Sequence, residues 1–313
     1  MAEYKGRGIH DESLYKSFKD GGRYENLMNL VREDEELDFE IRNNYVNIYY
    51  EGCNIAKISS AIGSVQFDKF YFLLRKDIKG NKPSKKEVQE NCNKGEVHYD
   101  LYMDLINKQK YLTDLFKDKK YSKYIDEAKC QVKKWFDSWE LNKEEKSTQQ
   151  KIVRANNEST TLCVIDNEYQ ISTDAPFKFV ADDSCEYEHK SPRFDLIAVD
   201  KNGQIYVIEL KKGLSACCGK AGLRSHAESF RCTIERDSKY FVEEMKSILE
   251  QKKELGLIDD SIKINDNKPK FVFAYETKDG EPIEAFYEKC VEEGVGNFDI
   301  YICEDSVLKP YNK

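Results

Sequence analysis

The sequence has no long apolar run and no familiar metal-binding cysteine or histidine motif. No stretch of its 313 residues approaches the roughly 18 apolar residues that a membrane-spanning helix needs. The 10 cysteines form no CxxC pair, and the 4 histidines form no HExxH or zinc-finger pattern. We therefore expect no contact with a membrane, no zinc site of these types, and free, mostly buried thiols.

Other absences narrow the class of protein further. Residues 1–6 lack the apolar core of a secretory signal, which favours a cytoplasmic protein. There is no internal repeat, no low-complexity tract and no glycine-rich nucleotide-binding loop. The hydrophobic share of 40% suffices for a packed core and excludes a largely disordered chain. At this length we expect two domains, which we place at residues 1–140 and 141–313.

Acidic residues exceed basic ones, 58 against 50, so the net charge is −8. A negative surface repels phosphate, and this argues against a histone-like or tail-driven nucleic-acid binder. It leaves open an enzyme whose basic residues are gathered in one place. Residues 211–236 fit that description, because six basic residues against two acidic ones give the segment a net charge of +4. The basic residues are Lys211, Lys212, Lys220, Arg224, Arg231 and Arg236.

The N-terminal domain is predicted to be α+β, and it contains no motif that indicates a chemical activity. Alternating apolar residues and the turn at Asn43-Asn44 predict a β-meander over 36–58. Residues 76–98 are polar and are expected to form an exposed loop. Apolar residues at helical spacing predict amphipathic helices over 101–116 and 121–139. The aromatic stripe of the second helix is typical of core packing, although a base-stacking platform is an alternative.

The C-terminal domain is predicted to be a mixed sheet with helices packed against it. A helix over 142–156 is followed by strands at 161–165 (continuing at 169–171), 194–199 and 205–210. Helices are then expected at 223–231 and 238–255, followed by a strand at 270–275, a helix at 283–293 and a last strand at 298–303.

Two of these strands carry charges where apolar residues are expected. Segments 194–199 and 205–210 are apolar on both faces, yet Asp195 lies in the first, while Glu209 and Lys211 close the second. Burying an unpaired charge costs several kcal/mol, so these groups need partners or a metal. If residues 201–203 form a three-residue hairpin loop that ends in left-handed Gly203, Asp195 lies opposite Glu209, and Lys211 shares their face. A two- or four-residue loop would separate the two carboxylates.

Adjacent carboxylates are hard oxygen ligands that suit Mg²⁺. Such a metal polarises a scissile phosphate, lowers the pKa of a bound water and orients in-line attack. A nearby lysine orients that water or stabilises charge on the transition state. The alternative interpretation is a structural ion-pair cluster, or a degenerate site retained for binding.

The pattern of Asp195, a hairpin and then Glu209-Leu210-Lys211 resembles the PD-(D/E)xK phosphodiesterase superfamily, the restriction-endonuclease-like nucleases. The resemblance covers roughly residues 142–303 and implies an αβββαβ core within an α/β (α+β overall) chain. It departs from the motif at Phe194, which precedes Asp195, so the literal Pro-Asp is missing.

The resemblance implies a role for each matching residue. Asp195 and Glu209 would be ligands of Mg²⁺, for which Mn²⁺ may substitute, and the main-chain carbonyl of Leu210 would complete the metal site. Lys211 would be the catalytic lysine. The family also has a glutamate in the helix before the first strand, and we prefer Glu145 over Glu144. Glu168, in the first strand segment, is a further acidic candidate.

Residues around this motif are candidate nucleic-acid contacts. Arg193 precedes Asp195 by two residues, and His226 follows in the next helix, where a phosphate contact, a proton relay or an ordinary surface role are the alternatives. The full set is Arg193, Lys212, Lys220, Arg224 and His226. The glycines from 213 to 222 suit either close approach of the backbone to a phosphate or a flexible loop.

The sequence thus predicts a metal-dependent endonuclease, with DNA as the favoured substrate and restriction, phage defence or DNA repair as the expected setting. A homodimer is favoured, because cutting both strands of a duplex usually takes two sites. Residues 1–140 would then recognise substrate, dimerise or bind a partner. The alternatives are a nuclease acting on RNA, or a catalytically silent nucleic-acid-binding or interaction protein that keeps the fold.

Overall fold

The structure is a computed structural model that describes residues 6–60, 64–77, 84, 86–88, 90, 99–139, 144–181, 191–277 and 280–311. The chain divides into two compact units. One runs from Ile9 to Ser147, and the other combines residues 6–8 with the chain from Thr148 onward. The sequence-based boundary after residue 140 differs from this division chiefly in assigning residues 6–8 to the first domain.

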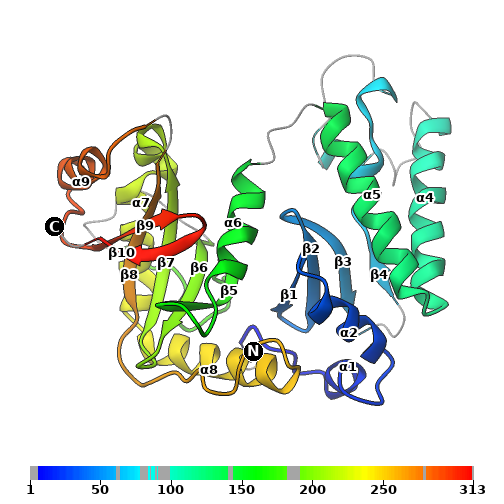
Figure 1. Cartoon of the computed structure of the whole chain (residues 1–313), viewed down its shortest axis with the longest axis horizontal. Coiled ribbons are helices and arrows are strands. Elements are labelled where there is room, and N and C mark those ends of the chain that lie inside the picture. Colours follow the sequence, from blue (N-terminus) through cyan, green and yellow to red (C-terminus); the bar gives the residue numbers. More distant parts are fainter. Residues whose placement is uncertain are drawn as a thin grey trace. The chain divides into compact units, whose positions relative to one another are not determined.

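The N-terminal unit contains a four-stranded antiparallel sheet preceded by two helices (Figure 1). The helices are α1 (Glu12–Ser17) and α2 (Glu25–Glu33), and the strands are β1 (Leu37–Arg42), β2 (Tyr45–Tyr50), β3 (Cys53–Ser59) and β4 (Val65–Gln66). Asn44 takes the left-handed conformation, with φ of 53°, in the tight turn between β1 and β2. The expected meander is therefore present, whereas α1 and α2 were not anticipated.

Two long helices complete this unit. The short 3₁₀ turns η1 (Lys69–Phe72) and η2 (Arg75–Asp77) lead toward α4 (Tyr99–Lys117) and α5 (Tyr121–Trp139). The aromatic residues of α5, such as Trp135 and Phe136, are buried and contact one another, so this stripe is core and not a base-stacking platform. Most of the loop expected over 76–98 lies outside the described residues, although 86–88 are helical.

The C-terminal unit is built on a six-stranded mixed sheet with the order β10-β9-β8-β7-β6-β5. Its strands are β5 (Leu162–Gln170), β6 (Arg193–Asp200), β7 (Ile205–Lys212), β8 (Lys270–Glu276), β9 (Asp299–Glu304) and β10 (Val307–Pro310). Neighbours pair antiparallel from β5 to β7, parallel from β7 to β9, and antiparallel at β9–β10. The sequence pattern predicted β5 as two segments and did not predict β10.

Helices cover both faces of this sheet, which explains why the residues of β6 and β7 that face either side are apolar. On one face α6 (Glu144–Ala155) packs Ile152 against the sheet, and α7 (Leu223–Phe230), α8 (Ser238–Glu254) and α9 (Ile283–Glu292) cover the other (Figure 1). The 3₁₀ turns η3 (Leu214–Cys217) and η4 (Gly219–Ala221) precede α7, and the π-helical turn η5 (Arg231–Glu235) follows it. The chain is thus a mixed α/β protein.

The hairpin between β6 and β7 has the register that its sequence predicts. Val199 pairs with Ile205 and Leu196 with Ile208, so the loop is residues 201–203. Gly203 has φ of +83°, and a Cβ at this position would lie 2.9 Å from the backbone nitrogen of Asn265. The three-residue loop with a left-handed glycine is confirmed.

Two expectations from composition can also be examined in the described part of the chain. All of its cysteines are free thiols, and most are buried, such as Cys217 and Cys290. No helix there is both long enough and apolar enough to span a bilayer.

Candidate active site

Three acidic residues lie in a row across neighbouring strands of the C-terminal sheet. The ladder between β6 and β7 ends at the pair of Leu196 and Ile208, and extending its register by one residue puts Asp195 opposite Glu209. In the pairing of β5 with β6, Asn167 lies opposite Leu196 and Tyr169 opposite Phe194, which places Glu168 opposite Asp195. The sequence predicted the Asp195–Glu209 pairing, but it named Glu168 without its place in the row.

The end of β7 holds a buried ion cluster. Glu209 and Lys211 are only 4% and 5% exposed. The ammonium of Lys211 lies 3.0 Å from Oε1 of Glu209 and donates a 2.8 Å hydrogen bond to the carbonyl of Ala221. Nε2 of His226, from α7, lies 3.0 Å from the same Oε1. The structure therefore brings His226 into the site instead of leaving it as an ordinary surface histidine.

The second carboxylate oxygen of Glu209 is an exception to the usual pairing of buried polar atoms. Oε2 is buried and has no hydrogen-bond partner within the described part of the chain. Buried polar atoms are paired in most folded proteins, so an unpaired carboxylate oxygen needs an explanation. A cation ligand is the explanation that its charge favours.

Asp195 is fixed both through its side chain and through its backbone. Its Oδ2 accepts a 2.9 Å hydrogen bond from the backbone nitrogen of Leu210. Its carbonyl accepts a 2.8 Å bond from the side-chain amide of Gln149, on α6. Gln149 lies one helical turn after Glu145, and no motif in the sequence marks it. The side chains of Glu144 and Glu145 lie outside the described residues, so the choice between them stays a prediction.

The electrostatics of the two facing carboxyls oppose their ionisation. Burial, followed by the charge of Asp195, raises the pKa of Glu209 well above its ordinary value, and Lys211 offsets this only in part. Burial also raises the pKa of Asp195, against the lowering effect of the Leu210 N–H, and the charge of Glu168 adds to the rise. A buried acid whose charge is opposed by burial and by a neighbouring carboxylate, as that of Glu209 is, favours a bound cation or a retained proton.

The donor set fits a hard divalent cation. Asp195 and Glu209 offer carboxylate oxygens, and Leu210 between Glu209 and Lys211 offers its main-chain carbonyl. In the described ranges no three His, Cys, Asp or Glu side chains stand together in an arrangement ready to hold a metal. A Mg²⁺ ion held by these groups would need water or phosphate to complete its coordination.

The basic candidates differ in how free they are to meet a nucleic acid. Arg193 is exposed and lies 3.7 Å from Glu168, at the end of the acidic row. Lys220 is exposed, next to the Ala221 carbonyl that binds Lys211. Lys212 is instead paired with Glu276 at 3.2 Å, and Arg224 is paired with the buried Glu228 at 3.3 Å. Arg193, Lys212 and Arg224 thus each have a carboxylate partner within this unit.

The glycine-punctuated loop after β7 wraps around Lys211. Its Ala221 carbonyl accepts the lysine's hydrogen bond, a contact that no sequence pattern indicates. A Cβ at Gly222 would lie 2.5 Å from the carbonyl oxygen of Cys217, so the chain folds tightly upon itself there. This glycine serves close packing of the loop, where the sequence had suggested flexibility or approach to a phosphate.

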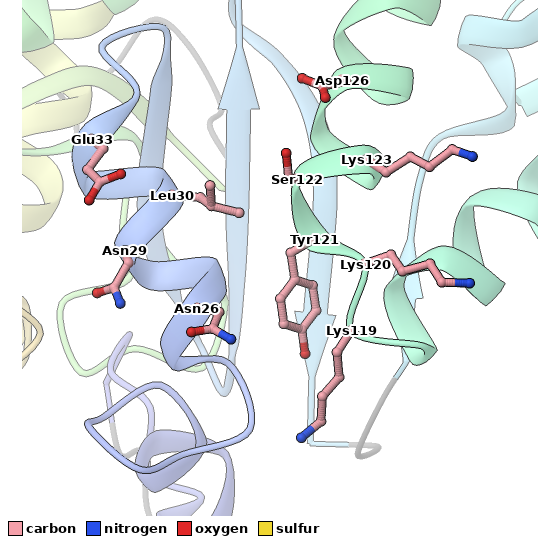
Figure 2. Close-up of a pocket in the computed structure, with 10 residues that line it drawn as sticks. All are labelled: Asn26, Asn29, Leu30, Glu33, Lys119, Lys120, Tyr121, Ser122, Lys123 and Asp126. Carbon is pink, nitrogen blue, oxygen red and sulfur yellow. The ribbon is translucent and has the colours of Figure 1, made fainter.

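A hollow of about 600 Å³ in the N-terminal unit is a weaker candidate. It lies between α2 and the start of α5, with Leu30 and Tyr121 reaching between the two helices (Figure 2). Lys120 and Lys123 point away from α2, so their charges are not directed into it (Figure 2). Nothing about the hollow resembles the paired carboxylates and lysine of the C-terminal unit.

No protein-family model, no curated protein and no solved structure matches the chain. The function is therefore inferred from the residues of this site alone.

Proposed function

We propose that the C-terminal unit is a metal-dependent nuclease that hydrolyses phosphodiester bonds, with DNA as its expected substrate. The observation that carries this proposal is the pairing of Asp195 with Glu209 beside Lys211, with one buried oxygen of Glu209 left without a hydrogen-bond partner in the described chain. A carboxylate pair with an adjacent lysine is suited to holding a divalent cation against a phosphate.

Each residue has a distinct part in the proposed reaction. Asp195, Glu209 and the carbonyl of Leu210 would hold Mg²⁺ or Mn²⁺, which when bound polarises the phosphate and lowers the pKa of a water. Lys211 uses two of its three ammonium protons on Glu209 and Ala221, which leaves one for the attacking water or a phosphate oxygen. His226 orients the Glu209 carboxylate through Oε1. Arg193 and Lys220 would attract the phosphate backbone.

The order of elements supports the same proposal. The series α6, β5, β6, β7, α7 and β8 agrees with the αβββαβ core that the resemblance to the PD-(D/E)xK superfamily implies. Action as a homodimer, and a role in restriction, phage defence or DNA repair, belong to the proposal as its expected setting.

A second candidate is a catalytically silent nucleic-acid-binding protein with this fold. It is favoured by the lack, among the described residues, of a group of three side chains ready to hold a metal. Such a protein would bind nucleic acid without cutting it, and its binding would not need Asp195 or Glu209.

The test is cleavage of plasmid, linear duplex, single-stranded DNA and RNA in Mg²⁺, Mn²⁺ or EDTA. We expect metal-dependent cleavage that falls by about 100-fold or more in Glu209→Gln and in Lys211→Ala. The matched control is Glu276→Gln, which changes the same residue type at the end of the adjacent strand β8 and should cleave like wild type. Comparing cleavage of the DNA and RNA substrates shows which nucleic acid the protein cleaves.

Two outcomes contradict the proposal in different ways. Equal cleavage by wild type and Asp195→Ala would show that the site is assigned to the wrong residues. Tight binding of nucleic acid with no cleavage under any metal would instead favour the silent binding protein.

A further inference from the structure

Arg7 is buried in the C-terminal unit, although about 140 residues separate it from the rest of that unit in sequence. Its Nε lies 3.0 Å from Oδ2 of Asp166, on β5. The central carbon of its guanidinium lies over the ring of Tyr169, 4.7 Å from the ring centre. Its backbone nitrogen donates a 3.1 Å hydrogen bond to Oε1 of Glu244, on α8. Tyr169 donates its hydroxyl proton to the same oxygen at 3.0 Å, so Arg7 ties β5 to α8.

The same guanidinium also holds the backbone of β5 where the strand departs from regular geometry. Nη2 of Arg7 donates to the carbonyls of Asn167 and Glu168, each at 3.3 Å. Glu168 has φ of +43°, in the left-handed region that residues other than glycine rarely adopt. Such a conformation persists only when its surroundings hold it, and Arg7 is the side chain that binds on both sides of it.

The conformation of Glu168 matters because this residue faces the candidate site. It lies opposite Asp195, between the cross-strand pairs Asn167–Leu196 and Tyr169–Phe194, and its half-exposed carboxylate lies 3.7 Å from the guanidinium of Arg193. Residues opposite each other on neighbouring antiparallel strands have Cβ atoms roughly 4.5–5.5 Å apart, which places the two carboxylates within electrostatic reach. A shift of the backbone at residue 168 would therefore change the charge that Asp195 meets.

We propose that Arg7 is a positioning residue that holds Glu168 beside Asp195, as an acid that acts from outside the metal's own ligands. The inference rests on the proposed function, because it assigns Glu168 a part in the binding of the divalent cation. An arginine is required for this geometry, since its planar fork contacts one carboxylate and two carbonyls at once, and a lysine ammonium has no such fork.

A merely structural role, in which Arg7 only neutralises buried Asp166, predicts something different. A lysine would then substitute well, because it carries the same charge. The experiment therefore compares Arg7→Lys, Glu168→Gln and the double variant with wild type. Tyr169→Phe is the matched control, because it removes a hydrogen bond of the same cluster and leaves the carbonyls of residues 167 and 168 held.

Binding of Mn²⁺ alone, measured by calorimetry on the full chain, is the first readout. We expect Arg7→Lys and Glu168→Gln each to weaken Mn²⁺ affinity by roughly tenfold, as loss of an outer contact to a metal site commonly does. The double variant should be no weaker than either single variant, because both changes act on one carboxylate. Tyr169→Phe should bind like wild type.

Hydrogen exchange of the peptide spanning 162–170 is the second readout, and it does not depend on metal. Arg7→Lys should lose protection there, while Glu168→Gln should keep it. If Arg7→Lys fails to fold, Arg7→Gln combined with Asp166→Asn removes both charges together and gives the same two readouts.

The outcomes separate this inference from the proposed function. Mn²⁺ binding that depends on Glu209 but is unchanged in Arg7→Lys, or losses that add in the double variant, would overturn the inference alone. If wild type binds no Mn²⁺, or if Glu209→Gln binds it as well as wild type does, both the inference and the proposed function are overturned.

Discussion

At the scale of single residues, Glu209 is placed where its charge is unfavourable. It is buried, it faces Asp195, and one of its oxygens has no hydrogen-bond partner within the described residues. Lys211 and His226 approach only the other oxygen. A residue chosen for stability alone would avoid this arrangement, and in the proposed function the bound cation accounts for it.

Glu209→Gln should make the metal-free protein more stable at alkaline pH. The pKa of Glu209 is raised in the folded state, so between its unfolded and folded pKa the folded chain binds more protons than the unfolded one. Wild-type stability must then fall as the pH rises through this window, and a glutamine removes that loss. We expect a gain on the order of 1 kcal/mol at pH 8 in EDTA, shrinking toward pH 4.

Thermal unfolding of both proteins across this pH range checks the prediction. Glu276→Gln, at the half-buried end of β8, should follow the wild-type profile. Parallel profiles for wild type and Glu209→Gln would show that the Glu209 carboxyl is not destabilising.

The left-handed conformation of Glu168 makes a second residue-scale prediction. Alanine normally stabilises a strand relative to glycine, but at φ of +43° its Cβ is strained and glycine is not. We therefore expect Glu168→Gly to be more stable than Glu168→Ala by about 1 kcal/mol. Urea unfolding measures the stability of both variants. A more stable alanine variant would contradict the conformation described for β5.

At the scale of elements, the β6–β7 hairpin sets which side chains meet. Side chains alternate along a strand, so a slip of one residue would move Asp195 to the opposite face from Glu209. The loop at residues 201–203 prevents such a slip. Asp200 accepts hydrogen bonds from the backbone nitrogens of Asn202 and Gln204, each at 2.9 Å, which closes the turn around Gly203.

Gly203→Ala should therefore destabilise the C-terminal unit by about 1–3 kcal/mol. The added Cβ would be strained at φ of +83° and would lie 2.9 Å from the nitrogen of Asn265. Lys201→Ala, in the exposed part of the same loop, is the control and should change stability little. Equal unfolding midpoints for the two variants would argue against this turn.

At the scale of the whole molecule, the C-terminal unit is made from two separate parts of the chain. Arg7 reaches Asp166, which is fully buried, across 159 residues of sequence. The unit formed by Ile9–Ser147 thus lies, in sequence, between two parts of the other unit. Loss of Arg7 would leave a buried carboxylate without its counter-charge.

Arg7→Met should accordingly lower the stability of the protein by about 3–5 kcal/mol. Adding Asp166→Asn removes the unpaired charge and should recover a large part of that loss. Calorimetry of the full chain measures both effects. Additive losses in the double variant would mean that Arg7 and Asp166 act independently of each other.

Local patterns in the sequence predicted much of the fold. The alternation in 36–58, the apolar runs of β6 and β7, and the helical spacing in α5 and α8 all correspond to observed elements. Several missed elements were short, such as α1, β4 and β10, whereas α2 has Leu27, Met28 and Val31 at helical spacing and could have been predicted. The pairing of Asp195 with Glu209 was predictable because one glycine at a tight turn specifies the register of both strands.

What the sequence by itself determined is therefore local: the periodicity of each element, and the hairpin that brings Asp195, Glu209 and Lys211 to one face. Tertiary structure decided the contacts that join distant segments. His226 on Glu209, Gln149 on the carbonyl of Asp195 and Arg7 on β5 all depend on how helices and the start of the chain pack against the sheet. No periodicity or turn encodes such contacts, because they arise only when separate elements bury their apolar faces together.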